Sequence, residues 1–284
     1  MKILSCNGKI KKTMLLIPLL AMSVFPGLTG AESASNEELA KQSIKNYVEA
    51  AQSGDVSEAA KWVVDTRFNS EEEQLKEYKE SLSSTPFSDV SIKNVVSASD
   101  ATYSDPTYTA TVELTRKDDG SINTVTYPII KKGDSWKVLL GGQETKSKKV
   151  EKLIQSQSEE NSTSSVKPLS IELTSYGSGT QWVSSGASIY SGQFNMTEDR
   201  VGIAGWQQIP GGTSKCAVRY SIVKKGIFGD DAYGQVFQTG FNYWNGAAFY
   251  NTIYTGNQYS GVHVRATNEE LGNTVKLRGH VYGN

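Results

Sequence analysis

The fold is decided by the stretch 107-TYTATVELTRKDDGSINTVTYPIIKKGDSWKVLL-140. Its first run, residues 107–115, alternates apolar with polar side chains and predicts a half-buried strand. Two turn signals, Asp118-Asp119-Gly120 and Lys132-Gly133-Asp134, each precede another alternating run. With an earlier strand over 90–96, these runs predict an antiparallel meander. Its predicted inward face consists of Tyr108, Ala110, Val112, Leu114, Val125, Tyr127, Ile129, Trp136, Val138 and Leu140.

Three helices are predicted ahead of the meander, between residues 35 and 82, from apolar side chains at helical spacing. Each begins with a capping residue that is followed three positions later by a glutamate, a pattern that satisfies free backbone N–H groups. The three pairs are Ser35 with Glu38, Asp55 with Glu58, and Ser70 with Glu73. Helices followed by an antiparallel sheet indicate an α+β domain.

The helical stretch SIKNYVEAAQSGDVSEAAKWV at 43–63 and the closing strand GDSWKVLL at 133–140 resemble the nuclear-transport-factor-2-like (cystatin-like α+β cone) superfamily. The resemblance covers residues 36–142 and implies a sheet curled around a long helix. That superfamily contains enzymes, binding modules and accessory domains, so the resemblance implies a fold and no activity. The inward face carries no acid or histidine, which favours an apolar core or a small apolar pocket.

The second half of the chain differs in composition. Residues 143–167 are polar and serine-rich, which predicts a linker, part of which can extend as an exposed helix. Residues 168–284 are rich in glycine, asparagine, threonine and tyrosine, with short alternating runs between turn signals. This pattern predicts an all-β domain, either a sandwich or a barrel.

Asn245-Gly246 is the strongest hairpin signal in this half, because both turn residues of such a hairpin need positive φ. The expected pairing sets Phe241 opposite Tyr250 and Phe237 opposite Tyr254. One face of this hairpin would offer rings beside amides, a combination that suits a neutral glycan. The alternative is that the rings pack in a core. This candidate glycan surface consists of Gln238, Asn242, Trp244, Phe249 and Asn251.

Residues 1–31 are predicted to be a signal peptide of the Gram-positive type, with a lysine-rich start, an apolar segment and small residues before a cleavage site after Ala31. A membrane anchor is the alternative, but the uninterrupted apolar run is too short to span. We therefore expect a secreted, extracellular protein. Cleavage would remove Cys6 and leave Cys216, which cannot form an internal disulfide alone.

Charge and motifs exclude several functions. Cleavage removes four lysines and no acid, so 25 basic and 30 acidic residues remain, and a net charge of −5 does not favour nucleic acid as a partner. The remaining cysteine and two histidines lack metal-ligand spacing, so no metal and no cofactor is expected. Cys216 alternates with apolar residues, which predicts a buried thiol, and no catalytic residue is assigned.

A basic cluster is predicted on the last two strands. If residues 268–273 form a connecting loop, Arg265 would lie opposite Lys276, and His263 opposite Arg278. Like charges directly opposite each other cost stability, which an anionic ligand would relieve. The alternative is a solvated face neutralised by Glu269, Glu270, Asp230 or Asp231. The candidate anion-binding residues are His263, Arg265, Lys276, Arg278 and His280.

The leading hypothesis is a secreted non-enzymatic binding protein of the bacterial envelope or medium, whose C-terminal domain binds an anionic cell-wall polymer or a glycan. The alternative is a secreted enzyme or toxin-like effector with an active site that no linear motif marks. Such an enzyme would need Cys216 or a carboxylate within hydrogen-bond reach of His263 or His280 in a cleft. The sequence leaves the oligomeric state open.

Overall fold

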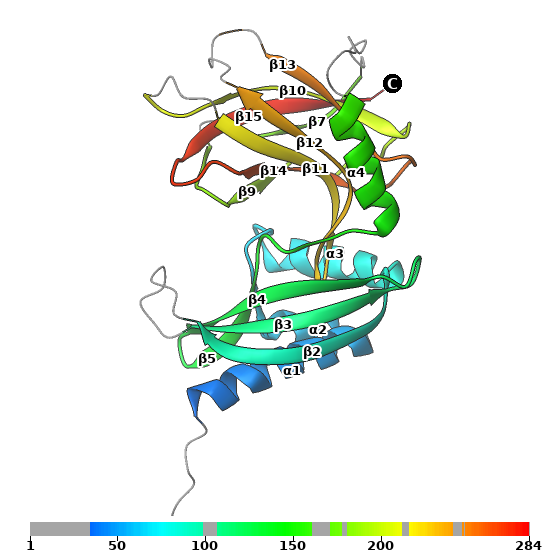
Figure 1. Cartoon of the computed structure of the whole chain (residues 1–284). Coiled ribbons are helices and arrows are strands. Elements are labelled where there is room, and N and C mark those ends of the chain that lie inside the picture. The colour runs from blue at the N-terminus through cyan, green and yellow to red at the C-terminus, as the bar shows by residue number, and fades with distance from the viewer. Residues whose placement is uncertain are drawn as a thin grey trace, which may run out of the picture. The chain divides into compact units, whose positions relative to one another are not determined.

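A computed structural model describes residues 35–98, 107–160, 171–177, 181–211, 216–240, 246 and 248–283. Residues Ser35–Asn284 form one compact unit that is mostly β-sheet with few helices (Figure 1). The expected signal peptide lies outside the described residues. No helix of the described residues is long and apolar enough to cross a membrane.

The N-terminal part begins with three helices: α1 Asn36–Ser53, α2 Val56–Lys61 and α3 Glu71–Ser83. The three predicted caps are confirmed, since the side chains of Ser35, Asp55 and Ser70 accept hydrogen bonds from the backbone N–H groups three residues on, at 3.2, 2.9 and 3.2 Å. Gly54 ends α1 with φ of 80°, a left-handed conformation that costs glycine little.

The helices pack on a five-stranded sheet, the first sheet, in the order β1-β5-β4-β3-β2. The predicted meander is confirmed, and all ten residues of its predicted inward face are buried. The sequence did not reveal β1, a three-residue strand that pairs parallel to β5. The strands are β1 Val63–Asp65, β2 Phe87–Ala98, β3 Thr107–Arg116, β4 Ile122–Lys132 and β5 Ser135–Leu140.

The C-terminal part consists of two more sheets that share a core (Figure 1). The β11–β14 sheet has the order β6-β12-β11-β14-β9, and the β10–β15 sheet has the order β13-β10-β15-β7, with β8 also paired to β15. The strands are β6 Glu144–Thr145, β7 Ile171–Tyr176, β8 Trp182–Val183, β9 Ser188–Tyr190, β10 Arg200–Gln208, β11 Cys216–Gly226, β12 Gly229–Gly240, β13 Phe249–Tyr254, β14 His263–Asn268 and β15 Val275–Gly283.

The segment expected to be a linker is largely ordered. Glu144–Thr145 forms β6, which pairs parallel to β12, and α4 spans Lys148–Glu160 beside β12 (Figure 1). Thr145, Ser147 and Val150 are buried, so this stretch contributes to packing, contrary to the expectation of a solvated connection. Residues 161–167 lie outside the described part of the chain.

The turn between β11 and β12 enters the core of the N-terminal part. This turn has two residues, Ile227 and Phe228, and both belong to the cluster formed by the helices and the first sheet. The Tyr47 hydroxyl donates to the Ile227 carbonyl, and the Tyr127 hydroxyl donates to the Phe228 carbonyl at 2.8 Å. The Phe228 ring also packs edge-on against Tyr47 at 6.3 Å between centroids. The core between the helices and the first sheet is therefore completed by two residues from the C-terminal half.

Candidate functional site

The two strands expected to form a terminal basic hairpin belong to different sheets. β14 pairs with β11 and β9, whereas β15 pairs with β10, β7 and β8. Arg265 therefore lies opposite Ser221 and Tyr190, and Lys276 lies opposite Gln208 and Trp182; the predicted pairing is wrong. Residues 269–274 cross from one sheet to the other. A loop of this length fits a crossover as well as a hairpin, so the sequence could not distinguish them.

Three of the five predicted basic residues share one outward face. On β15, Val275, Leu277 and Val281 fill the core, so Lys276, Arg278 and His280 point to the opposite side and are partly exposed. Aromatic side chains from neighbouring strands lie on the same side, including Trp182, which is 48% exposed, and Tyr250, which is 67% exposed. We call this surface the aromatic-basic face: Trp182, Trp206, Tyr250, Tyr282, Lys276, Arg278 and His280.

Two of the cations on this face lie against indole rings. The Lys276 ammonium is 5.8 Å from the centre of the Trp182 ring, and the Arg278 guanidinium is 4.7 Å from that of Trp206. Both distances allow an electrostatic attraction between cation and ring. The Trp206 indole N–H donates to the Gly246 carbonyl at 2.7 Å, which fixes the orientation of that ring.

His280 completes the row on β15. Its Nδ1 atom lies 2.8 Å from a carboxylate oxygen of Glu172, and both side chains are about half-exposed. Three of the four acids that we expected to neutralise the basic cluster pair elsewhere: Asp230 and Asp231 with arginines of the N-terminal part, and Glu269 with Arg219. Glu172, an acid that the sequence analysis did not single out, therefore lies beside His280 on this row.

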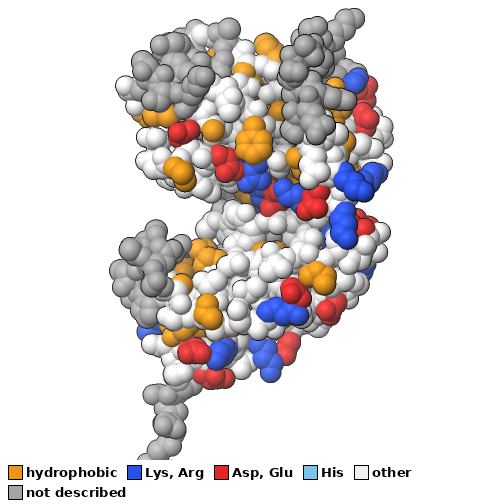
Figure 2. Space-filling view, viewed as in Figure 1, with side chains coloured by type: hydrophobic (Ala, Val, Ile, Leu, Met, Phe, Trp, Pro, Cys, Tyr) orange, Lys and Arg blue, Asp and Glu red, His pale blue; other side chains and the backbone are white. Residues whose placement is uncertain are grey.

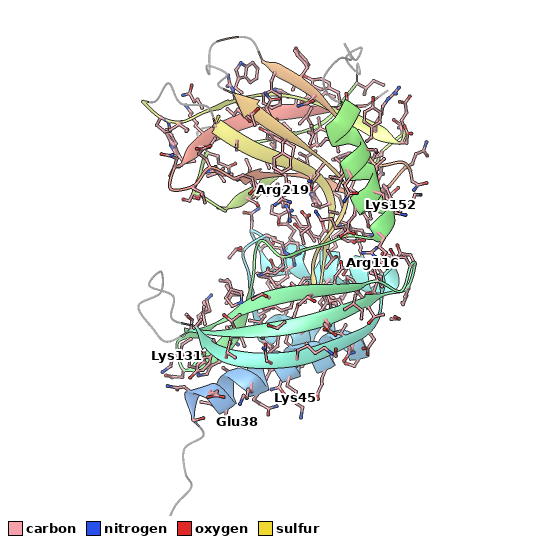
Figure 3. The ribbon with its side chains drawn as sticks, in the orientation of Figure 1. Glu38, Lys45, Arg116, Lys131, Lys152 and Arg219 are labelled. Carbon is pink, nitrogen blue, oxygen red and sulfur yellow. The ribbon has the colours of Figure 1, made fainter. Side chains whose placement is uncertain are left out.

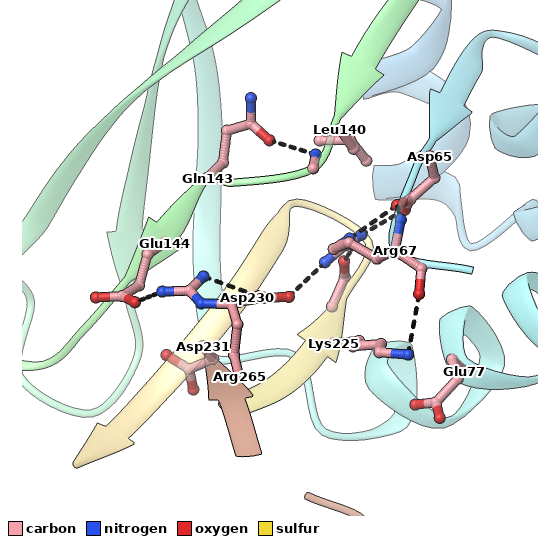
Figure 4. A network of polar contacts seen from close by, with 12 residues as sticks. Asp65, Arg67, Glu77, Leu140, Gln143, Glu144, Lys225, Asp230, Asp231 and Arg265 are labelled. Atoms are coloured by element: carbon pink, nitrogen blue, oxygen red, sulfur yellow. Dashed lines mark hydrogen bonds and ion pairs between the residues drawn. The ribbon is translucent and has the colours of Figure 1, made fainter. Parts of the chain in front are cut away.

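The other two predicted basic residues, His263 and Arg265, are buried at the junction with the N-terminal part. Arg265 is 1% exposed, and its guanidinium contacts Glu144 and, at 2.8 Å, Asp230 (Figure 4). Asp230 also binds Arg67 at 2.8 Å and accepts from the Tyr190 hydroxyl at 2.7 Å. These two residues do point outward from their sheet, but the N-terminal part covers that side. They are therefore not accessible to a polymer, and their assignment as ligand-binding residues is corrected.

His263 binds acceptors on both sides. Its Nδ1 lies 2.9 Å from the Ser191 carbonyl, and its Nε2 lies 3.3 Å from Glu77 on α3. Burial acts to raise the pKa of Glu77, but the hydrogen bond and charge of His263 hold it below the usual value. Burial raises the pKa of Asp230, against the effect of Arg67, and lowers the pKa of Arg265 to about 10. We call Arg67, Glu77, Glu144, Asp230, His263 and Arg265 the junction cluster. Its opposite charges are buried and pair with one another inside the protein.

Charged side chains of both signs also surround the junction at the surface. Figure 2 shows lysine, arginine and acidic side chains interleaved there. Arg219, labelled in Figure 3, pairs with Glu144 at 3.0 Å and with Glu269 at 2.6 Å. The Arg116–Asp231 pair, at 2.6 Å, is buried beneath this surface. Mixed charge of this kind offers no excess of either sign to a charged ligand.

The candidate glycan surface is not assembled as predicted. β13 pairs with β10 and not with β12, so Tyr250 lies opposite Ala204 and Tyr254 opposite Arg200. Phe249 is 6% exposed and belongs to the core, as the alternative interpretation held. Asn251 donates to Gln238 at 2.9 Å. Asn242 and Trp244 lie outside the described residues.

The features expected of an enzyme are dispersed. Cys216 is buried and donates to the Gly240 carbonyl at 3.0 Å, and burial raises the pKa of its thiol to about 11. Of the two glutamate–histidine contacts described above, that of His263 is buried and that of His280 lies on an exposed sheet face. A cavity of about 500 Å³ lies in the N-terminal part, and neither histidine nor cysteine lines it. Within the described ranges, no group of three or more histidine, cysteine, aspartate or glutamate residues is placed to hold a metal ion.

Sequence reasoning missed the aromatic members of the aromatic-basic face. Trp206 lies near the end of the run RVGIAGWQQ at 200–208, in which Val201 and Ile203 alternate with Gly202 and Ala204. The small residues weaken that pattern, although alternation alone would have placed Trp206 on the outward side. Trp182 belongs to a two-residue strand, which is too short to show a period.

Comparison with known proteins gives little for the C-terminal part. Residues 33–139, less than half of the chain, match a family described as "Domain of unknown function (DUF4878)". No curated protein matches the chain. Three solved chains match, among them one from a study of carbohydrate-binding modules of the β-sandwich superfamily, with 10% identity, 67% of this chain and 84% of that chain covered, and a TM-score of 0.22. Superposition at this level identifies neither a common fold nor a common ligand.

Proposed function

We propose that this is a secreted non-enzymatic binding protein of the bacterial envelope or medium, and that its aromatic-basic face binds an acidic polysaccharide of the cell wall. The observation that carries the proposal is the row on β15, where Lys276 and Arg278 lie against the Trp182 and Trp206 rings. Localisation follows from the predicted signal peptide, and the cell wall as the source of the polymer from the Gram-positive type of that peptide.

The chemistry of the face favours an acidic sugar chain over either class of ligand considered from the sequence alone. Exposed rings offer flat apolar surfaces on which the C–H side of a sugar can stack. Cations next to those rings attract carboxylate or phosphate groups. A neutral glycan would use the rings and not the cations, whereas a simple polyanion would use the cations and not the rings.

In this proposal the N-terminal part is an accessory module that supports the C-terminal sheets and does not itself bind the ligand. We propose that residues 36–142 form a nuclear-transport-factor-2-like module, followed by an all-β sandwich. Support for this accessory role comes from the filled interior, where Tyr47 and Tyr127 bind the carbonyls of Ile227 and Phe228. These two hydroxyls are thus occupied by the chain itself and are not available to orient a small ligand in this core.

The test is retention of the full mature chain on purified cell walls and on immobilised acidic polysaccharide, at low and high salt. We expect retention at low salt that falls as salt rises, because exposed charges act over about 10 Å at 0.1 M ionic strength. Lys276→Gln with Arg278→Gln should strongly reduce retention at low salt and remove its dependence on salt, without unfolding the protein. The matched control is Lys148→Gln with Lys152→Gln, two exposed lysines on α4 that should leave retention unchanged (Figure 3). Equal retention of both double variants would contradict the proposal.

A further inference from the structure

Three rings of the aromatic-basic face lie on one oblique line across the strands. In the ladder, Trp182 on β8 is opposite Lys276, Trp206 on β10 is opposite Arg278, and Tyr250 on β13 is opposite Ala204. The strand order is β8, β15, β10, β13. From Trp182 to Trp206 the line crosses two strand spacings, and from Trp206 to Tyr250 it crosses one. At each of these two steps it also advances by two residues along the strands.

Strand geometry gives the length of this line. Neighbouring strands lie about 4.8 Å apart and residues advance about 3.4 Å along a strand, so Trp182 and Trp206 are about 12 Å apart and Trp206 and Tyr250 about 8 Å apart in the plane of the sheet. The three rings together span about 20 Å. This is the reach of a chain of several sugar units rather than of a single one.

The cations occupy the longer of the two intervals. Lys276 and Arg278 are on β15, the strand between β8 and β10, so both lie between the two indoles. The order along the line is ring, cations, ring, ring. His280 lies one step further along β15, opposite Ala204, and its nearest acid is Glu172. Positive charge on the line is thus confined to one interval.

We propose, on the basis of the proposed function, that a linear acidic polysaccharide lies along this line, with sugar faces on Trp182, Trp206 and Tyr250 and an acidic group between the two indoles. The ligand is recognised over about 20 Å of its length, and its acidic group is needed at one position only. Side chains of a strand stand roughly perpendicular to the sheet, so all three rings face the same side. Because the surface is an open sheet face, affinity accumulates over several shallow contacts and depends on chain length.

The experiment measures the affinity of the full mature chain for oligogalacturonides of increasing length, and for neutral oligomers of matched length. For acidic chains, affinity should rise with length until the chain spans about 20 Å and then level off. Trp182→Ala should reduce the affinity for long acidic chains at least tenfold and leave the affinity for the shortest chains nearly unchanged. The control is Phe237→Ala, which removes a ring that is 53% exposed on the other C-terminal sheet. This variant should change neither the affinity for long chains nor that for short chains.

The position of charge is tested separately. Arg278→Gln with Lys276→Gln should reduce the affinity for acidic chains to that for neutral chains, while the dependence on length persists. If the protein binds acidic chains of all lengths equally, or if Trp182→Ala and Phe237→Ala act alike, the path is wrong but the proposed function stands. If no acidic chain binds at any length, although circular dichroism shows that the protein is folded, both the path and the proposed function are wrong.

Discussion

β14 and β15 carry similar basic side chains at alternating positions, yet the two rows have opposite surroundings. On β14, His263 and Arg265 are enclosed by Glu77, Asp230 and Glu144. On β15, Lys276 and Arg278 lie against indole rings on an outward face. Alternation determines which side of a sheet a residue occupies, but what covers that side depends on contacts with distant parts of the chain. One row therefore stabilises the junction, and the other can contact a ligand.

The largest expected effect is a difference in stability between variants of the two rows. Arg265→Met should lower the free energy of unfolding by about 3–4 kcal/mol, because the buried Asp230 and Glu144 carboxylates each lose one of their cations. Arg278→Met, on the outward row, should change it by less than about 1 kcal/mol. Urea unfolding of both variants measures the difference. Similar losses would show that the rows are not distinct in this way.

Phe228→Ala tests whether the junction belongs to the core. Because the ring is buried among the helices and the first sheet, its removal should lower the free energy of unfolding by about 3 kcal/mol. Phe237→Ala changes an exposed ring on β12, the strand that follows this turn, and should cost less than about 1 kcal/mol. A mild effect of Phe228→Ala would mean that the first sheet packs well without the turn.

The two glutamate–histidine contacts should respond differently to acid. The folded state holds the pKa of Glu77 below its usual value, so its ionised form stabilises the protein above about pH 4.3, and this contribution is lost as the pH falls further. Glu77→Gln should cost about 2 kcal/mol at pH 7 and progressively less in acid. Glu172→Gln, at the exposed pair, should cost under about 0.5 kcal/mol at either pH. The measurement is the thermal stability of wild type and both variants between pH 3 and 7. Equal pH dependence of the two variants would contradict this prediction.

Cys216 gives the smallest expected effect. Cys216→Ala should cost about 1 kcal/mol at pH 7, since a small buried group is lost. Burial raises the thiol pKa to about 11, so the folded state keeps its proton where the unfolded state has lost it. Stability from the thiol therefore falls as the pH rises above about 8.5, and the gap between wild type and variant should close. Rapid labelling of Cys216 in the folded protein would contradict its burial.

Local signals predicted the local structure. The caps at Ser35, Asp55 and Ser70, the meander and its inward residues follow from patterns within a few residues, and they are found in the structure. Strand partners in the C-terminal part could not be predicted, because β13 and β14 each join strands that periodicity does not single out. The same holds for the candidate site. Its three basic residues were found by alternation, whereas the rings beside them depend on pairing with β8, β10 and β13.

The two-residue turn at Ile227 and Phe228 also sets an order for folding. The Tyr47 hydroxyl and its acceptor are 180 residues apart in the chain, so the first core closes only after most of the polypeptide is present. Contacts of such long range slow folding, and an N-terminal part that waits for them keeps apolar surface exposed in the meantime. A chain emerging from its N-terminal end would thus keep its first core open until residue 228 follows, and the β11–β12 hairpin would close that core from the C-terminal half.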